Sequence, residues 1–107
     1  MLFKFKSKAA GDLIMLEPNG RRVLQIIGKD PSPQGIIEPH QMPAAIVALE
    51  AAIVREEAQQ RAAVEEARAR GEDPPRPEGV SLRQRAVPFI DMLRRCQQAD
   101  KEIVWGV

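Results

Sequence analysis

Four basic residues form the candidate site of this sequence. Arg83 and Arg85 lie one turn inside the predicted start of the last helix, and Lys4 and Lys6 lie in the first predicted strand. A helix N-terminus attracts anions because its backbone N–H groups are unpaired and its dipole is positive there. The four side chains are therefore the candidate site for an anionic group, carried by a phosphorylated metabolite or by a nucleic acid.

The two arginines are unusual residues for a first helical turn, where negative charge is favoured. Three interpretations stay open. The arginines form ion pairs within the chain, with Asp91 or Asp12 as partners, or they bind an external phosphate or carboxylate, or they are simply exposed. Of the three, we favour ion pairing within the chain.

The chain has one cysteine, Cys96, and one histidine, His40, so a nucleophilic pair is the other arrangement to weigh. Cys96 lies three residues after Leu93 on the apolar side of the last predicted helix, a position typical of a small core residue. A reactive thiolate needs an electropositive, partly exposed site, and a structural zinc ion needs four ligands. We therefore predict no catalytic residue, no cofactor and no metal ion.

Length and composition predict one domain, spanning residues 1–107. The chain is 44% hydrophobic and 29% charged, with a net charge of +1, as is usual for a globular protein. The balanced charge disfavours a nucleic-acid partner, and three Phe, one Trp and no Tyr leave few rings for base stacking. No apolar run reaches the length of a membrane span, so no membrane partner is expected. Because no apolar leader is present and Cys96 cannot pair within the chain, we expect a cytoplasmic protein.

Three segments are predicted to be strands. Residues 2–7 alternate between apolar and polar side chains, which predicts a half-buried strand with its phenylalanines on one face and its lysines on the other. Residues 8–11 form a loop of hairpin length, and the apolar run within residues 12–16 is expected to pair back antiparallel. Residues 103–105 predict a closing strand that pairs with one of the first two.

Residues 17–28 admit two interpretations. Asn19 and Gly20 between apolar runs are typical of a tight hairpin turn, which would make residues 23–27 a strand. Alternatively, Asn19 caps a helix whose apolar residues follow helical spacing and whose end is marked by Gly28. We favour the helix, and the strand stays open.

The longest helix is predicted to begin near Pro43 and to continue to Arg70, because no Gly or Pro interrupts it. One apolar stripe runs along its first half and consists of Met42, Ile46, Leu49 and Ile53. Beyond Val54 the stripe fades, and Glu56 takes its next position. Residues 55–80 are therefore expected to form a solvated helix extension with paired Glu and Arg, followed by a proline-rich connection.

Ser81 and Gln84 form a capping box, which predicts that the last helix begins there. Its apolar residues repeat with the same spacing as those of the long helix, and they are Leu82, Ala86, Phe89, Leu93 and Cys96. The two helices are therefore expected to pack side by side as an antiparallel hairpin. Pro88 lies inside the last helix and predicts a kink or a short 3₁₀ turn.

Together these elements predict an α+β fold. A small antiparallel sheet, made of the N-terminal hairpin plus the C-terminal strand, packs against a short helix and a long antiparallel helix hairpin. Both chain termini then lie in the sheet.

Three motifs span the chain: FKSKAAGD at residues 5–12, GII-P-QMPAAI at residues 35–46, and SLRQRA at residues 81–86 together with the ending VWGV. These motifs resemble a family of small uncharacterised proteobacterial proteins that is defined as a domain of unknown function. The resemblance implies a bacterial cytoplasmic origin. It implies no activity, cofactor or catalytic residue.

Two classes of function are compatible with these observations. The first is a non-enzymatic interaction or regulatory module, with a homodimer as one form of it, that uses the sheet edge or the long helix. The reason is that no catalytic set of residues accompanies a helix longer than one core needs. The alternative is an anion-binding protein that uses Lys4, Lys6, Arg83 and Arg85.

Overall fold

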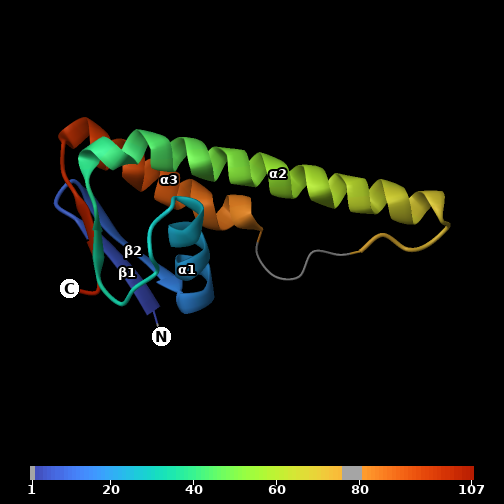
Figure 1. Ribbon diagram of the computed structural model, residues 1–107, viewed down its shortest axis with the longest axis horizontal. Coiled ribbons are helices and arrows are strands. Elements are labelled where there is room, and N and C mark those ends of the chain that lie inside the picture. The colour runs from blue at the N-terminus through green and yellow to red at the C-terminus, as the bar shows by residue number, and fades with distance from the viewer. Residues whose placement is uncertain (1, 76–80) are drawn as a thin grey trace.

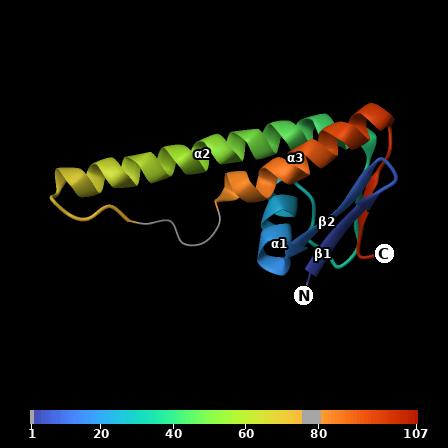
Figure 2. The same ribbon diagram turned by 180° about the vertical axis from the view of Figure 1, so that it is seen from behind.

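A four-stranded sheet and three α-helices make up the computed structural model, which describes residues 2–75 and 81–107. The strands are β1 (Leu2–Ser7), β2 (Ala10–Leu16), β3 (Gly35–Ile37) and β4 (Ile103–Trp105), all antiparallel to their neighbours, in the spatial order β2-β1-β4-β3. The helices are α1 (Glu17–Ile26), α2 (Met42–Ala69) and α3 (Leu82–Ala99), and a 3₁₀ turn, η1 (Pro39–Gln41), leads into α2. The helices lie on one side of the sheet, and α2 projects far beyond it (Figure 1, Figure 2). This is the predicted α+β fold.

The hairpin of β1 and β2 follows the alternation of the sequence. Leu2 lies opposite Leu16 and Phe5 lies opposite Leu13, with a β-bulge between Phe5 and Ser7. The two phenylalanines of β1 are buried against the helices, whereas its lysines are not. The turn is tighter than predicted, since residues 10–11 belong to β2 and not to the loop.

The C-terminal strand pairs with the first strand, as predicted, with Phe5 opposite Trp105. The sequence pattern did not reveal that β4 has a second neighbour, β3, so that the last strand is interior to the sheet. Gly35 makes this pairing possible, because a Cβ atom at that position would collide with the indole ring of Trp105. The indole Nε1–H donates to the carbonyl of Ser32 over 2.9 Å and fastens the preceding loop to the sheet.

Residues 17–26 form helix α1, so the helical interpretation of this segment is confirmed. The predicted cap at Asn19 is wrong, because the helix already begins at Glu17. Gly20 does not form a turn: it brings α1 close to β1, and a Cβ atom there would lie 2.6 Å from Cδ2 of Phe3. The helix ends before Gly28, as predicted, where the N–H of Lys29 donates to the carbonyl of Leu24 over 2.8 Å.

The core lies between the sheet and the antiparallel pair of α2 and α3. Phe5 of β1 and Phe89 of α3 are both fully buried, with ring centroids 4.8 Å apart. The capping box at the start of α3 is confirmed, because the N–H of Gln84 donates to Oγ of Ser81 over 3.2 Å and the side chain of Gln84 accepts from the N–H of Ser81. These contacts position the helix hairpin over the sheet.

Pro88 does not interrupt α3, which is α-helical from Leu82 to Ala99, so the predicted 3₁₀ turn is absent from this helix. Pro88 cannot donate a hydrogen bond to the carbonyl of Gln84. Both residues are exposed, so water can take the place of the missing donor.

The second half of α2 is mostly solvated. Ala67 is the one buried residue within residues 55–75, all of which are described. The Cα atoms span 52 × 28 × 22 Å, and the projecting helix accounts for the long dimension (Figure 1). The predicted proline-rich connection is described only as far as Pro75, and its remaining part, residues 76–80, lies outside the described residues.

Candidate functional site

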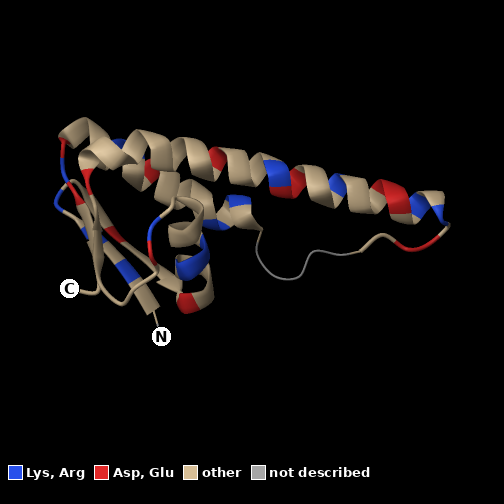
Figure 3. Cartoon of the chain, in the orientation of Figure 1, with Lys and Arg blue, Asp and Glu red and all other residues tan. Residues whose placement is uncertain are grey.

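The four predicted anion-binding residues lie on two layers of the structure. Phe5 faces the helices, so Lys4 and Lys6, its neighbours on β1, face the opposite side of the sheet. Arg83 and Arg85 lie at the start of α3, in the helical layer. The fold therefore separates the two lysines from the two arginines, and Arg83 and Arg85, two residues apart on α3, lie on different sides of that helix. Figure 3 shows Lys and Arg spread over both the sheet and the helices.

Lys4 and Arg83 have carboxylate partners within the chain. The ammonium group of Lys4 lies 3.5 Å from Oδ2 of Asp12 on the outer face of the sheet. Arg83 forms a two-pronged pair with Glu57, with Nε and Nη2 donating to the two carboxylate oxygens over 2.7 and 2.9 Å. Arg85 is half-buried and also has an interaction partner. Ion pairing within the chain was the favoured interpretation, and for Arg83 the partner is Glu57, not Asp91 or Asp12.

The pair of Glu57 and Arg83 has shifted pKa values. Hydrogen bonds from Arg83 hold the pKa of the Glu57 carboxyl below its ordinary value, against a smaller opposing effect of desolvation, and the charges of Arg83 and Arg61 add to the lowering. The same hydrogen bonds raise the pKa of the Arg83 guanidinium. This ion pair links α2 and α3. Because both side chains remain in contact with solvent, salt screens it.

Glu56 is the residue of this region whose role the sequence pattern did not reveal. Its Oε2 accepts a hydrogen bond from the backbone N–H of Leu82 over 3.1 Å, and its Oε1 accepts one from Nη2 of Arg22 over 2.9 Å. Its side chain is only 22% exposed, so the expectation of a solvated carboxylate is wrong. The available signal was its place three residues after Ile53 on the core side of α2.

A third side-chain contact joins α2 and α3. Nη2 of Arg94 on α3 donates to Oε2 of Glu50 on α2 over 3.3 Å. Acidic residues on α2 therefore face arginines on α3 at both Glu50 and Glu57. This arrangement fits the antiparallel alignment of the two helices, and both carboxylates have partners within the chain.

Cys96 and His40 do not form a reactive pair at the surface. Cys96 is fully buried in the core, whereas His40 is exposed on η1. Within residues 2–75 and 81–107, no three or more His, Cys, Asp or Glu side chains are grouped to hold a metal ion. None of the helices in this described part has the length and hydropathy of a membrane span.

A family model described as "Domain of unknown function (DUF1840)" matches residues 1–105 of the chain. The chain belongs to this family. The resemblance inferred from the three motifs is thereby confirmed at the level of the family. No curated protein and no solved structure matches the chain. The candidate sites in this DUF1840 chain therefore rest on its own geometry.

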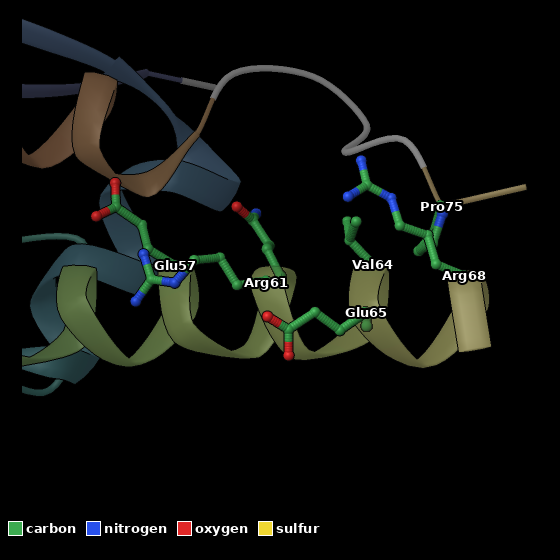
Figure 4. Close-up of a pocket in the computed structure, with 8 residues that line it drawn as sticks. Glu57, Arg61, Val64, Glu65, Arg68 and Pro75 are labelled. Carbon is green, nitrogen blue, oxygen red and sulfur yellow. The ribbon is translucent and has the colours of Figure 1, made fainter.

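The projecting part of α2 borders an open hollow of about 800 Å³ (Figure 4). Val64 and Pro75 contribute apolar surface, and Arg61, Glu65 and Arg68 contribute charges of both signs. A site that performs acid–base chemistry needs carboxylates in a low-dielectric environment. The acid Glu65 is exposed and has no such environment.

Proposed function

We propose that this chain is a non-enzymatic protein-interaction or regulatory module of the bacterial cytoplasm, and that the projecting part of α2 engages its partner. The observation that carries the proposal is the length of α2. Its 28 residues correspond to about 42 Å, against about 27 Å for the 18 residues of α3. Residues 55–69 add one buried side chain, so the core does not account for them.

The surface of this extension supports the proposal. It combines apolar Val64 with the charges of Arg61, Glu65 and Arg68 around one open hollow. Mixed polar and apolar surfaces of this kind are typical of protein interfaces that form and dissociate. The cytoplasmic setting is part of the proposal and is supported by a free, buried Cys96, which is usual in a reducing compartment.

A shortened variant tests the proposed role of the extension. A short Gly-Ser linker replaces residues 60–79, which keeps both Glu57 and Arg83. We expect its melting temperature to stay within about 3 °C of the parent chain, because the removed residues bury little surface. Proteins that co-purify with the 107-residue chain from its host are then compared with those retained by the shortened variant.

A partner that binds the parent chain and not the shortened variant, and that rebinds as a purified protein in calorimetry, supports the proposal. A matched control keeps the length and reverses two charges, with Arg61→Glu and Arg68→Glu. We expect this charge-reversed variant to weaken binding and to lower the melting temperature only slightly, since Arg61 makes a minor contribution to the lowered pKa of Glu57. An identical set of partners for parent and shortened chains would overturn the role of the extension, and substrate turnover by the purified chain would overturn the non-enzymatic assignment.

The alternative, anion binding by Lys4, Lys6, Arg83 and Arg85, has one supporting observation. Lys4 and Lys6 share one exposed face of β1, where they can approach the same phosphate. Anion binding there has to compete with Asp12 for Lys4, and binding at the helix start has to compete with Glu57 for Arg83.

A further inference from the structure

The sheet has one face that no helix of the described residues 2–75 and 81–107 covers. The helices pack on the face that carries Phe3, Phe5 and Trp105, and the opposite face is open in both views (Figure 1, Figure 2). Four of the eight exposed large hydrophobic side chains in the described part of the chain belong to this outer face. They are Leu2 (60% exposed), Ile14 (55%), Leu16 (61%) and Ile36 (41%).

The strand sequences also indicate a sheet covered on both faces. A strand with one solvated face alternates between apolar and polar residues, whereas a strand covered on both faces is continuously apolar. Only β1 alternates. β2 ends in the continuous run of residues 13–16, and β4 consists of residues 103–105, both without a polar side chain. These strands have the composition of a sheet covered on both faces, whereas the described part of the chain covers one face.

We propose that a second copy of this chain covers the outer face, with the two sheets packed face to face. This inference rests on the proposed role as an interaction module and names one partner and the surface that binds it. The two-fold axis lies in the interface, parallel to β1 and β2 and midway between them. It stacks β1 of one copy on β2 of the other. Because Leu2 lies opposite Leu16 in the hairpin, this axis places Leu2 of one copy on Leu16 of the other.

The charges of the outer face fit the same two-fold axis. Lys6 lies opposite residues 11–12 in the hairpin, on the side of the bulge between Phe5 and Ser7. The axis therefore brings Lys6 of one copy toward Asp12 of the other. Opposite charges meet twice in the dimer. The same axis places Lys4 of one copy on Ile14 of the other, where the aliphatic stem of Lys4 can pack while its ammonium group stays beside Asp12 of its own chain.

The area of this face is also consistent with a dimer. The four exposed apolar side chains amount to roughly 400 Å², which is within the range of exposed patches that mark interaction sites. A standard interface buries about 800 Å² per partner, so the apolar residues supply about half and the surrounding polar residues supply the rest. All rings of Phe3, Phe5 and Trp105 point inward, so the outer face lacks the stacking platform that a single-stranded nucleic acid requires.

The oligomeric state of the 107-residue chain tests this inference. Light scattering after size exclusion, from micromolar to near-millimolar protein, is expected to give the mass of two chains of 11.9 kDa at the upper concentrations. Ile14→Glu with Leu16→Glu is expected to give a single chain throughout. Both side chains are exposed in the monomer, and an unchanged circular dichroism spectrum establishes that this variant folds.

A matched control carries Val47→Glu with Val54→Glu, two similarly exposed positions on α2, and is expected to remain dimeric. Asp12→Lys is expected to raise the dimer dissociation constant at least tenfold, and Lys6→Asp in the same chain is expected to restore it. A single-chain mass for the parent protein at every concentration would overturn the inference. So would a dimer that the α2 control abolishes and the β2 variant retains.

These results are separate from those for the proposed function. A chain that stays monomeric but binds a host protein through α2 contradicts the dimer and leaves the interaction module intact. A monomer that sediments with lipid vesicles through Ile14 and Leu16 assigns the outer face to a membrane surface and likewise contradicts the dimer. A dimer whose partners are the same with and without residues 60–79 supports this inference and contradicts the role of the extension.

Discussion

Oε2 of Glu56, on α2, accepts a hydrogen bond from the backbone N–H of Leu82, the first residue of α3, over 3.1 Å. The first turn of α3 has no acidic residue and carries Arg83 instead. Glu56 therefore supplies, from a neighbouring helix, the negative charge that the start of α3 lacks. Because the same carboxylate binds Arg22 of α1, one side chain joins three helices.

We expect Glu56→Ala to lower the free energy of unfolding by about 1 to 2 kcal/mol, because it removes a helix-capping acceptor and leaves Arg22 without its partner. Glu56→Gln keeps an acceptor but loses the charge, so its effect is expected to be smaller. Urea denaturation measures both. Glu65→Ala, at an exposed position of the same helix, is the control and is expected to change little. Equal effects of Glu56→Ala and Glu65→Ala would contradict the capping role.

The pair of Glu57 and Arg83 predicts a pH dependence. Because the folded-state pKa of Glu57 is lowered from 4.5, the pair stabilises the fold above that pH and loses its effect as the pH falls through the lower folded-state value. Glu57→Gln is therefore expected to melt below the parent chain at neutral pH, and the difference is expected to shrink as the pH falls below the folded-state pKa of Glu57, or in high salt. A difference that widens toward acid would contradict this.

Local patterns were sufficient to predict most of the elements. The alternation of β1, the capping box at Ser81 and the apolar stripes of α2 and α3 each depend on residues close in sequence, and each is present in the structure. The closing strand was predictable because residues 103–105 are apolar, aromatic and β-branched. These signals need no knowledge of the partner segment.

The rest depends on contacts between distant segments. β3 has three residues, and only its pairing with β4, far along the chain, makes it a strand. The partners of Glu56 and Glu57 depend on how α2 and α3 align, and the connection between them does not specify that register. Whether the four residues of the candidate anion site lie close together also depends on the layer in which Lys4 and Arg83 lie. The sequence pattern left this open.

Pro88 predicts a stabilising substitution. Pro88→Ala restores an N–H group for the carbonyl of Gln84 and removes the ring from the helix interior, and we expect a gain of about 1 to 2 kcal/mol after the greater freedom of the unfolded chain is counted. Thermal and urea denaturation measure this gain. A loss of stability would contradict this prediction and would assign a stabilising role to the ring in the shallow hollow that Pro88 lines together with Asp12 and Leu13 of β2.

The anion-binding alternative predicts that the arginines and the lysines both contribute. If it holds, Arg83→Gln with Arg85→Gln weakens the binding of inorganic phosphate and of a short oligonucleotide, and so does Lys4→Gln with Lys6→Gln. Calorimetry at low salt measures these affinities, since salt screens such contacts. Affinities that the arginine variant leaves unchanged would contradict the four-residue site, because the start of α3 would then take no part in anion binding.

Gly35 and Gly11 provide a matched pair of substitutions within the sheet. A Cβ atom at Gly35 collides with the indole ring of Trp105, which is 2% exposed and held by its hydrogen bond to Ser32, so the ring has no room to move aside. We expect Gly35→Ala to cost at least about 2 kcal/mol, as overpacking of a core does. At Gly11, in β2, an added Cβ atom would meet nothing within 4 Å, so Gly11→Ala is expected to be neutral or slightly stabilising. Urea denaturation with tryptophan fluorescence reports both stability and the surroundings of Trp105. Similar stabilities for the two variants would contradict the close packing of β3 on β4 that places the last strand inside the sheet.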